Sequence, residues 1–328
     1  MVTKQCGWVV ACAALALAGC AREEPSLNGE MAFQDGRWVP VAAAADDAAE
    51  NDLVLIRWYF NHGRHRKAIK FAKKFLKKYV DDPRGEEVMM IAATAEIRRE
   101  RYYQAYEWLE KLLDLHPIGR YFERALVREV QVAEAFLAGK KRVVWGFIYL
   151  SAREEALEIL LRIAEHAPGS AIAEEAMLRI PDYRYSSRQY GEAVEAYDQY
   201  LELFPKAEGA PHAMLHAARA YSMTFKGVAY DAGPLIEADL RYRTLIAAFP
   251  ATAARHDVRA AIGQIAVKLA NKDYVTARLY ERTHRPDAAA FYYRQVTSRY
   301  PQTAWAARAR NELQRLDKAI AGQPREEP

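Results

Sequence analysis

Cysteine is scarce in this sequence, and every cysteine lies close to the N-terminus. The three cysteines among the 328 residues are Cys6, Cys12 and Cys20. The long remainder of the chain therefore has no thiol for a disulfide, a metal site or a catalytic nucleophile. After Cys20 no apolar run approaches the roughly 20 residues that a membrane-spanning helix needs. We expect a body that is held together by its apolar core alone.

A charge excess of one sign and the common catalytic motifs are missing as well. Lys and Arg number 47 against 43 Asp and Glu, and the resulting net charge of +4 does not indicate a nucleic-acid-binding protein. The sequence contains no Gly-x-Ser-x-Gly elbow, Gly-x4-Gly-Lys phosphate loop, Gly-x-Gly-x2-Gly turn or His-Glu-x2-His pair. These absences predict a protein that is not an enzyme and needs no cofactor.

The first twenty residues are typical of an export signal. Lys4 precedes an apolar run, Val9 to Leu17, that is too short to cross a bilayer. The segment Leu17-Ala18-Gly19-Cys20 resembles the bacterial lipobox, and this resemblance implies cleavage before Cys20 and a lipid on its thiol. An ordinary signal peptide with a chance cysteine is the alternative. Ala21 stands where lipoproteins kept in the inner membrane have Asp, which favours the outer membrane.

The chain is expected to have four parts. Residues 1–19 form the signal peptide, 20–51 a lipidated tether, 52–317 a folded helical array and 318–328 a flexible tail. Prolines in the array are predicted to fall at the ends of helices, and no stretch alternates apolar and polar residues over the length of a strand.

One spacing recurs along the array. An alanine is followed by an aliphatic or aromatic residue four and seven positions later, and by a proline twelve positions later. The five full copies begin at Ala105, Ala156, Ala193, Ala238 and Ala289, and a degenerate copy begins at Ala68. The pattern resembles the second helix of a tetratricopeptide repeat, which predicts an all-α solenoid of about five to six helical hairpins. Successive prolines are 34 to 51 residues apart, so we expect inserts at 139–149 and 226–234.

The lipobox, the tether and the repeats together resemble the BamD/YfiO family of outer-membrane β-barrel assembly lipoproteins. The most specific segment is Leu269-Ala270-x-Lys272-x-Tyr274-x2-Ala277-x2-Tyr280-Glu281-Arg282. The resemblance implies a lipid-anchored scaffold at the periplasmic face of the outer membrane, without catalysis of its own. Implied partners are a POTRA-containing barrel protein and unfolded barrel clients. A periplasmic adaptor for cell-wall or envelope machinery, built from the same repeats, is the alternative.

A run of cations is the sharpest local feature of charge. Between Arg57 and Lys78 there are nine cations and no acid. A solvated helix face is the plainest explanation, and contact with anionic lipid or an acidic partner is the functional one. The residues chosen for that contact are Arg66, Lys70, Lys73, Lys74 and Lys77.

Two groups of aromatic residues are candidates for protein binding. Trp145 and Phe147 lie in the basic insert, which suits a membrane-interface or protein contact as well as a loop that packs on itself. Tyr183 and Tyr185 are candidates for a concave surface that holds an extended peptide.

His212 and His216 are one helical turn apart and could share a metal ion. No third ligand is evident near them in the sequence. We therefore favour ordinary histidines of the repeat surface, expect no metal, and keep a metal-dependent hydrolase only as a remote alternative.

Overall fold

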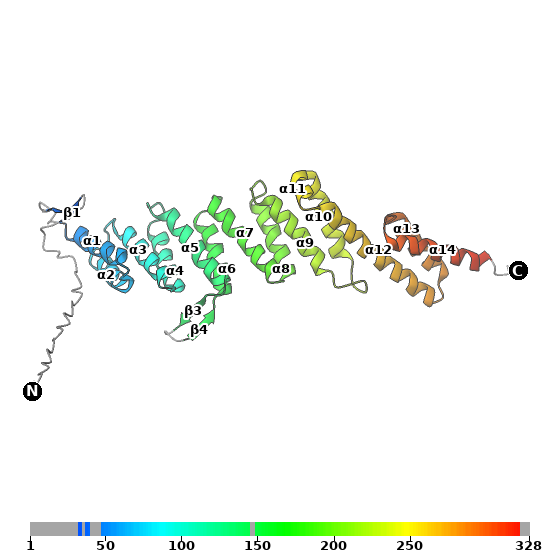
Figure 1. Ribbon diagram of the computed structural model, residues 1–328, viewed down its shortest axis with the longest axis horizontal. Helices are drawn as coiled ribbons and strands as arrows, with labels where there is room; N and C mark the ends of the chain where they lie inside the picture. Colours follow the sequence, from blue (N-terminus) through cyan, green and yellow to red (C-terminus); the bar gives the residue numbers. More distant parts are fainter. Residues whose placement is uncertain (1–31, 35–36, 40–46, 145–147, 322–328) are drawn as a thin grey trace, which may run out of the picture. The chain divides into compact units, whose positions relative to one another are not determined.

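The computed structural model describes residues 32–34, 37–39, 47–144 and 148–321 (Figure 1). The signal peptide, Cys20 and most of the proposed tether lie outside the described residues. The chain divides into two compact units, residues 1–91 and 92–328, which are described separately.

The first unit contains a small hairpin and a helix pair. Strands β1 (Ala32–Gln34) and β2 (Arg37–Val39) are antiparallel, with Phe33 opposite Trp38. Helix α1 (Ala48–Asn61) packs against α2 (His65–Lys78), and α3 (Gly85–Arg98) contains the boundary between the units. Asp47 begins α1 by accepting hydrogen bonds from two backbone N–H groups of the first turn, and Tyr59 is buried against α2.

The second unit is a succession of helices in which each packs on the next (Figure 1). Helices α5 and α7, and α7 and α9, are also in contact. A short hairpin of β3 (Lys141–Val144) and β4 (Ile148–Ser151) lies between α5 and α6. The helices are α4 (Tyr102–Leu115), α5 (Phe122–Leu137), α6 (Arg153–His166), α7 (Ala171–Ser186), α8 (Tyr190–Leu203), α9 (Ala210–Thr224), α10 (Gly233–Ala248), α11 (Pro250–Arg255), α12 (Val258–Arg282), α13 (Pro286–Arg299) and α14 (Ala304–Ala321).

The recurring alanines explain how the helices approach one another. All six that begin a copy of the repeat are fully buried, each on the second helix of a hairpin, because a larger side chain would push the helices apart. They are Ala68, Ala105, Ala156, Ala193, Ala238 and Ala289. The prediction of an all-α, tetratricopeptide-like array of helical hairpins is therefore confirmed.

The proline of the repeat also acts locally, on the end of the helix before it. In five copies the C-cap residue, which follows the last helical residue, lies just before the proline, and it has φ between −128° and −136° and ψ between 49° and 66°. A residue before proline is sterically disfavoured in the α region, so the helix stops there.

Two sequence expectations about the array are corrected. Pro181 lies inside α7 and is buried, although prolines were predicted only at helix ends; it removes one backbone donor without ending the helix. The insert at 139–149 contains strands although none was predicted. Four-residue strands are too short to show an alternating pattern, and they are defined instead by their pairing, in which Arg142 lies opposite Leu150.

Candidate interaction surfaces and polar clusters

Helix α2 carries its cationic residues on one side and its apolar residues on the other. The apolar side is buried inside the first unit through residues such as Ala72 and Phe75. The five residues predicted to contact an anionic surface are all exposed: Arg66, Lys70, Lys73, Lys74 and Lys77. Within the described part of the chain, none of the five forms an ion pair with an acidic side chain, so their charges remain uncompensated locally.

The cations at the two ends of the run are paired with acidic side chains. Arg57 lies on α1, where it forms hydrogen bonds of 2.7 and 2.8 Å to Glu87 and one of 3.2 Å to Glu50. Lys78, at the other end of the run, pairs with Asp52 at 3.2 Å. The positive surface is thus the middle of α2.

The β3–β4 hairpin is fixed at its base and exposed on one strand. The guanidinium of Arg142 lies 3.6 Å from the ring centre of Tyr103 on α4 and 3.6 Å from a carboxylate oxygen of Glu155 on α6. Tyr149 and Leu150 on β4 are 62% and 48% exposed. Trp145 and Phe147, the residues chosen from the sequence, lie outside the described residues.

The two tyrosines chosen on α7 are only partly exposed. The ring of Tyr185 contacts Tyr190 of α8 and His216 of α9, with centres 5.5 and 5.2 Å apart. Tyr183 lies on the same helix, two residues earlier. Neither tyrosine lines the cavity of about 250 Å³ between α6, α7 and α8, which is lined by Leu161, Met177, Ile180, Pro181, Arg184, Glu192, Glu195, Ala196 and Gln199.

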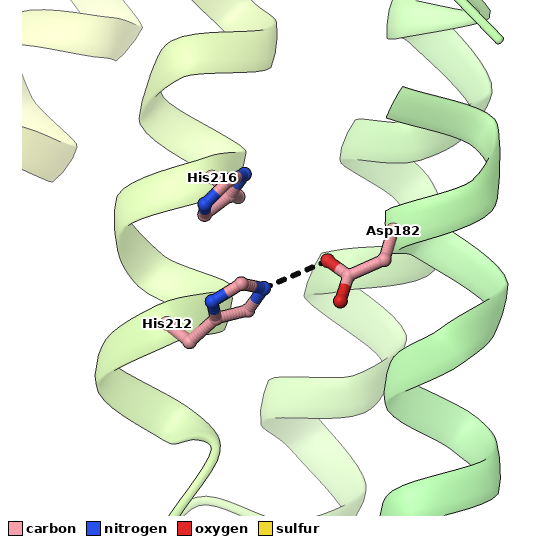
Figure 2. Close-up of side chains that lie close together, drawn as sticks. All are labelled: Asp182, His212 and His216. Carbon is pink, nitrogen blue, oxygen red and sulfur yellow. Dashed lines mark hydrogen bonds and ion pairs between the residues drawn. The ribbon is translucent and has the colours of Figure 1, made fainter. Parts of the chain in front are cut away.

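A polar cluster joins α7 and α9 next to these tyrosines (Figure 2). His212 Nε2 lies 2.8 Å from Asp182 Oδ1, and the same oxygen accepts a hydrogen bond from the Tyr197 hydroxyl. The rings of His212 and His216 are stacked, with centres 4.2 Å apart. Asp182 precedes His212 by 30 residues, so the spacing of residues in the sequence did not reveal that the two side chains are in contact.

Burial and charge set the protonation of this cluster. Burial, and then the neighbouring His212 and Arg219, lower the pKa of His216 to about 4, so its ring is neutral at pH 7. Burial alone would raise the pKa of Asp182, but the hydrogen bonds from His212 and Tyr197 outweigh it and leave that pKa lowered. The carboxylate is therefore ionised at neutral pH.

A second buried group lies between α4, α5 and α6. Glu129 on α5 is fully buried, and in the described ranges neither of its carboxyl oxygens has a hydrogen-bond partner. Burial, and then the negative charge of Glu110, raise its pKa well above the ordinary value. Glu110 itself is paired with Arg162 at 3.1 Å and lies 3.7 Å from His166.

None of the helices described here is both long enough and apolar enough to cross a membrane.

Known proteins resemble this chain in sequence. The assembly factor BamD of Caulobacter vibrioides is described as an outer membrane protein assembly factor and is 24% identical over 150 residues. The match covers 46% of this chain and 49% of the relative, so the chain spans about half the length of the curated relative it matches.

Two solved tetratricopeptide repeat proteins also align with the chain. One, from Parabacteroides merdae, has 15% identity and a TM-score of 0.34, and the alignment covers 82% of this chain and 98% of that one. The other, from Thermus thermophilus, has 20% identity and a TM-score of 0.30, covering 66% and 98%.

The strongest relation is to a family rather than to one protein. The family model YfiO, described as outer membrane lipoprotein, matches residues 148–321. The matched segment begins at β4 and contains every helix from α6 to α14. Since this segment is more than half of the chain, the chain belongs to the YfiO family of outer membrane lipoproteins.

Proposed function

We propose that this protein is a lipid-anchored, non-catalytic scaffold of the machinery that assembles β-barrel proteins in the outer membrane. Cys20 is the proposed lipid acceptor, and the helical hairpins hold partner subunits at the periplasmic face. The observation that carries the proposal is the family match over α6–α14, together with the assembly role for which the Caulobacter relative is named.

The chemistry of the two units suits such a role. Anchoring at Cys20 would keep the array near the membrane and raise the effective concentration of its partners. The uncompensated cations of α2 would face anionic headgroups. Partner contact is assigned to the β3–β4 insert with Trp145 and Phe147, and to the α7 surface with Tyr183 and Tyr185.

Site-specific crosslinking in native membranes tests this assignment. A photoreactive amino acid is placed at Trp145, Phe147 or Tyr183, with Ile118, a fully exposed residue of the α4–α5 turn, as the control position. We expect the first three positions to crosslink to a POTRA-containing barrel protein or to unfolded barrel precursors, and Ile118 to crosslink to neither. Recovery of cell-wall enzymes in their place would support the adaptor alternative and contradict the proposal.

A further inference from the structure

The cluster of Asp182, His212 and His216 has the composition of a metal site. One ligand atom from each residue can be chosen so that all three lie within 4.8 Å of one another. A tetrahedral zinc site with bonds of about 2.0–2.2 Å separates its ligand atoms by roughly 3.4 Å. Small side-chain rotations are therefore enough to bring the three atoms to zinc-binding distances.

The positions of the ligands on the helices favour chelation. His212 and His216 are one turn apart on α9, with their rings stacked on the side that faces α7 (Figure 2). Asp182 projects from α7 toward them, and α7 and α9 are in contact. Two ligands on one rigid helix and a third on its neighbour lose little freedom when they bind an ion.

The hydrogen bonds of Asp182 also suit a metal. Asp182 Oδ1 already accepts two hydrogen bonds, whereas Oδ2 carries none within the described part of the chain. The Tyr197 hydroxyl would orient the carboxylate, as a hydrogen-bonding partner behind a metal ligand commonly does.

His216 supplies an independent observation. Its Nδ1 atom is buried and has no hydrogen-bond partner among the residues that the structure describes, although buried polar atoms are usually paired. A buried, unsatisfied imidazole nitrogen beside a carboxylate and a second imidazole is the arrangement that an imidazole-binding ion completes.

The other group of possible ligands in the described residues is less suitable. Glu110, Asp114 and His166 also converge, but the guanidinium of Arg162 is bound to Glu110 at 3.1 Å and supplies the positive charge there. Arg219 is a positive neighbour of His216, but it forms no ion pair with Asp182 within the described part of the chain.

We propose that Asp182, His212 and His216 bind one zinc-class divalent ion, with water in the fourth position, and that the ion links α7 to α9. The ion would fix one helical hairpin of the array to the next. This site is separate from the partner surfaces and the lipid anchor proposed above.

Metal titration of the purified full-length chain tests the site. After treatment with a chelator, Zn²⁺ is added in a calorimeter and Co²⁺ is followed by its visible absorption. We expect one ion per chain, Co²⁺ bands of a site with nitrogen and oxygen ligands, and a higher thermal unfolding midpoint with Zn²⁺. The variants Asp182→Asn and His212→Gln should weaken binding at least tenfold, and His216→Gln should do the same.

His166→Ala is the matched control, because it removes the histidine of the other candidate group. It should leave the stoichiometry and affinity unchanged. Circular dichroism without metal checks that each variant is folded, and the near-isosteric Asp182→Asn keeps the test valid if a histidine variant does not fold. Absence of stoichiometric binding by the unmodified chain, or unchanged binding by Asp182→Asn and His212→Gln, would overturn the proposal.

Discussion

Four turns between the two helices of a hairpin each depend on one residue whose backbone has the left-handed helical conformation. Gly63, Glu100, Arg188 and His284 have φ between 56° and 69°, each between the two helices of a hairpin. In all four turns the next residue donates its backbone N–H to a carbonyl five positions earlier, as Gln189 does to Arg184. Only the first turn has the glycine that this conformation favours.

Replacing Arg188 by glycine should therefore stabilise the protein. The left-handed conformation costs a residue with a side chain about 1–2 kcal/mol, and glycine avoids this cost. Glycine also has more conformational freedom in the unfolded chain, which offsets part of the stabilisation. We expect Arg188→Gly to raise the free energy of unfolding by about 0.5–1 kcal/mol in urea titrations.

Gly63→Ala is the converse control. A Cβ at Gly63 would meet no atom within 4 Å, so only backbone strain is added. Its unfolding free energy should fall by about 1 kcal/mol. Equal stability of the unmodified chain and both variants would contradict this explanation of the turns.

Glu129 should make stability depend on pH. Because its pKa is raised in the folded state, the folded chain holds a proton that the unfolded chain releases above pH 4.5. Its contribution to stability is complete below that pH and is lost as the pH rises toward the folded-state pKa, by at most about 1.4 kcal/mol per pH unit.

Glu129→Gln removes this titration. Urea titrations between pH 4.5 and 9 should show a smaller decline for the variant than for the unmodified chain. Two parallel curves would mean that Glu129 does not titrate in this range.

At the scale of the helix, the buried alanines set how closely neighbours pack. Ala289 is fully buried where α13 meets its neighbours, whereas Ala307 on α14 is exposed. Ala289→Leu should overpack this contact and lower the unfolding free energy by about 1–3 kcal/mol. Ala307→Leu should change it by less than about 0.5 kcal/mol. A small effect at both positions, measured by thermal or urea unfolding, would contradict the role given to the alanines.

The cation face of α2 is also a property of one helix. Each lysine near an anionic surface contributes about 1 kcal/mol, so reversing Lys70, Lys73 and Lys77 to Glu should weaken binding to anionic vesicles by 100-fold or more. The measurement is vesicle flotation with the Cys20→Ala chain, which removes the proposed anchor. Added salt should reproduce part of the loss.

Reversal of three exposed lysines outside α2 is the control for net charge. Lys206, Lys226 and Lys268 serve this purpose, and the triple variant should retain most of the vesicle binding. If both triple variants bind alike, the α2 face has no special role.

The repeat helices could be predicted from the sequence because their causes are local. The alanine at the helix crossing and the proline after the helix each act within a few residues, and both are visible as a spacing. The left-handed turn at Arg188 was not foreseen, because its side chain is one that usually avoids this conformation. Asp182 was missed as a neighbour of His212 because only the packing of α7 on α9 brings them together.

At the scale of the whole molecule, anchoring at the membrane depends on one residue. Cys20 is the only cysteine that would remain after the proposed cleavage. Cys20→Ala should shift the protein from the outer-membrane fraction to the soluble periplasmic fraction, because all the acyl chains would be attached to this one residue. Membrane fractionation with immunoblotting measures the shift, and unchanged membrane association would contradict lipid attachment at this residue.

Depletion of the protein in its own bacterium tests the central claim most directly. Folded and unfolded outer-membrane barrel proteins are distinguished by their different mobility in electrophoresis before and after heating. The account predicts that depletion lowers the folded, membrane-inserted fraction, and that expression of the full chain restores it. Normal insertion of barrel proteins after depletion would contradict the account.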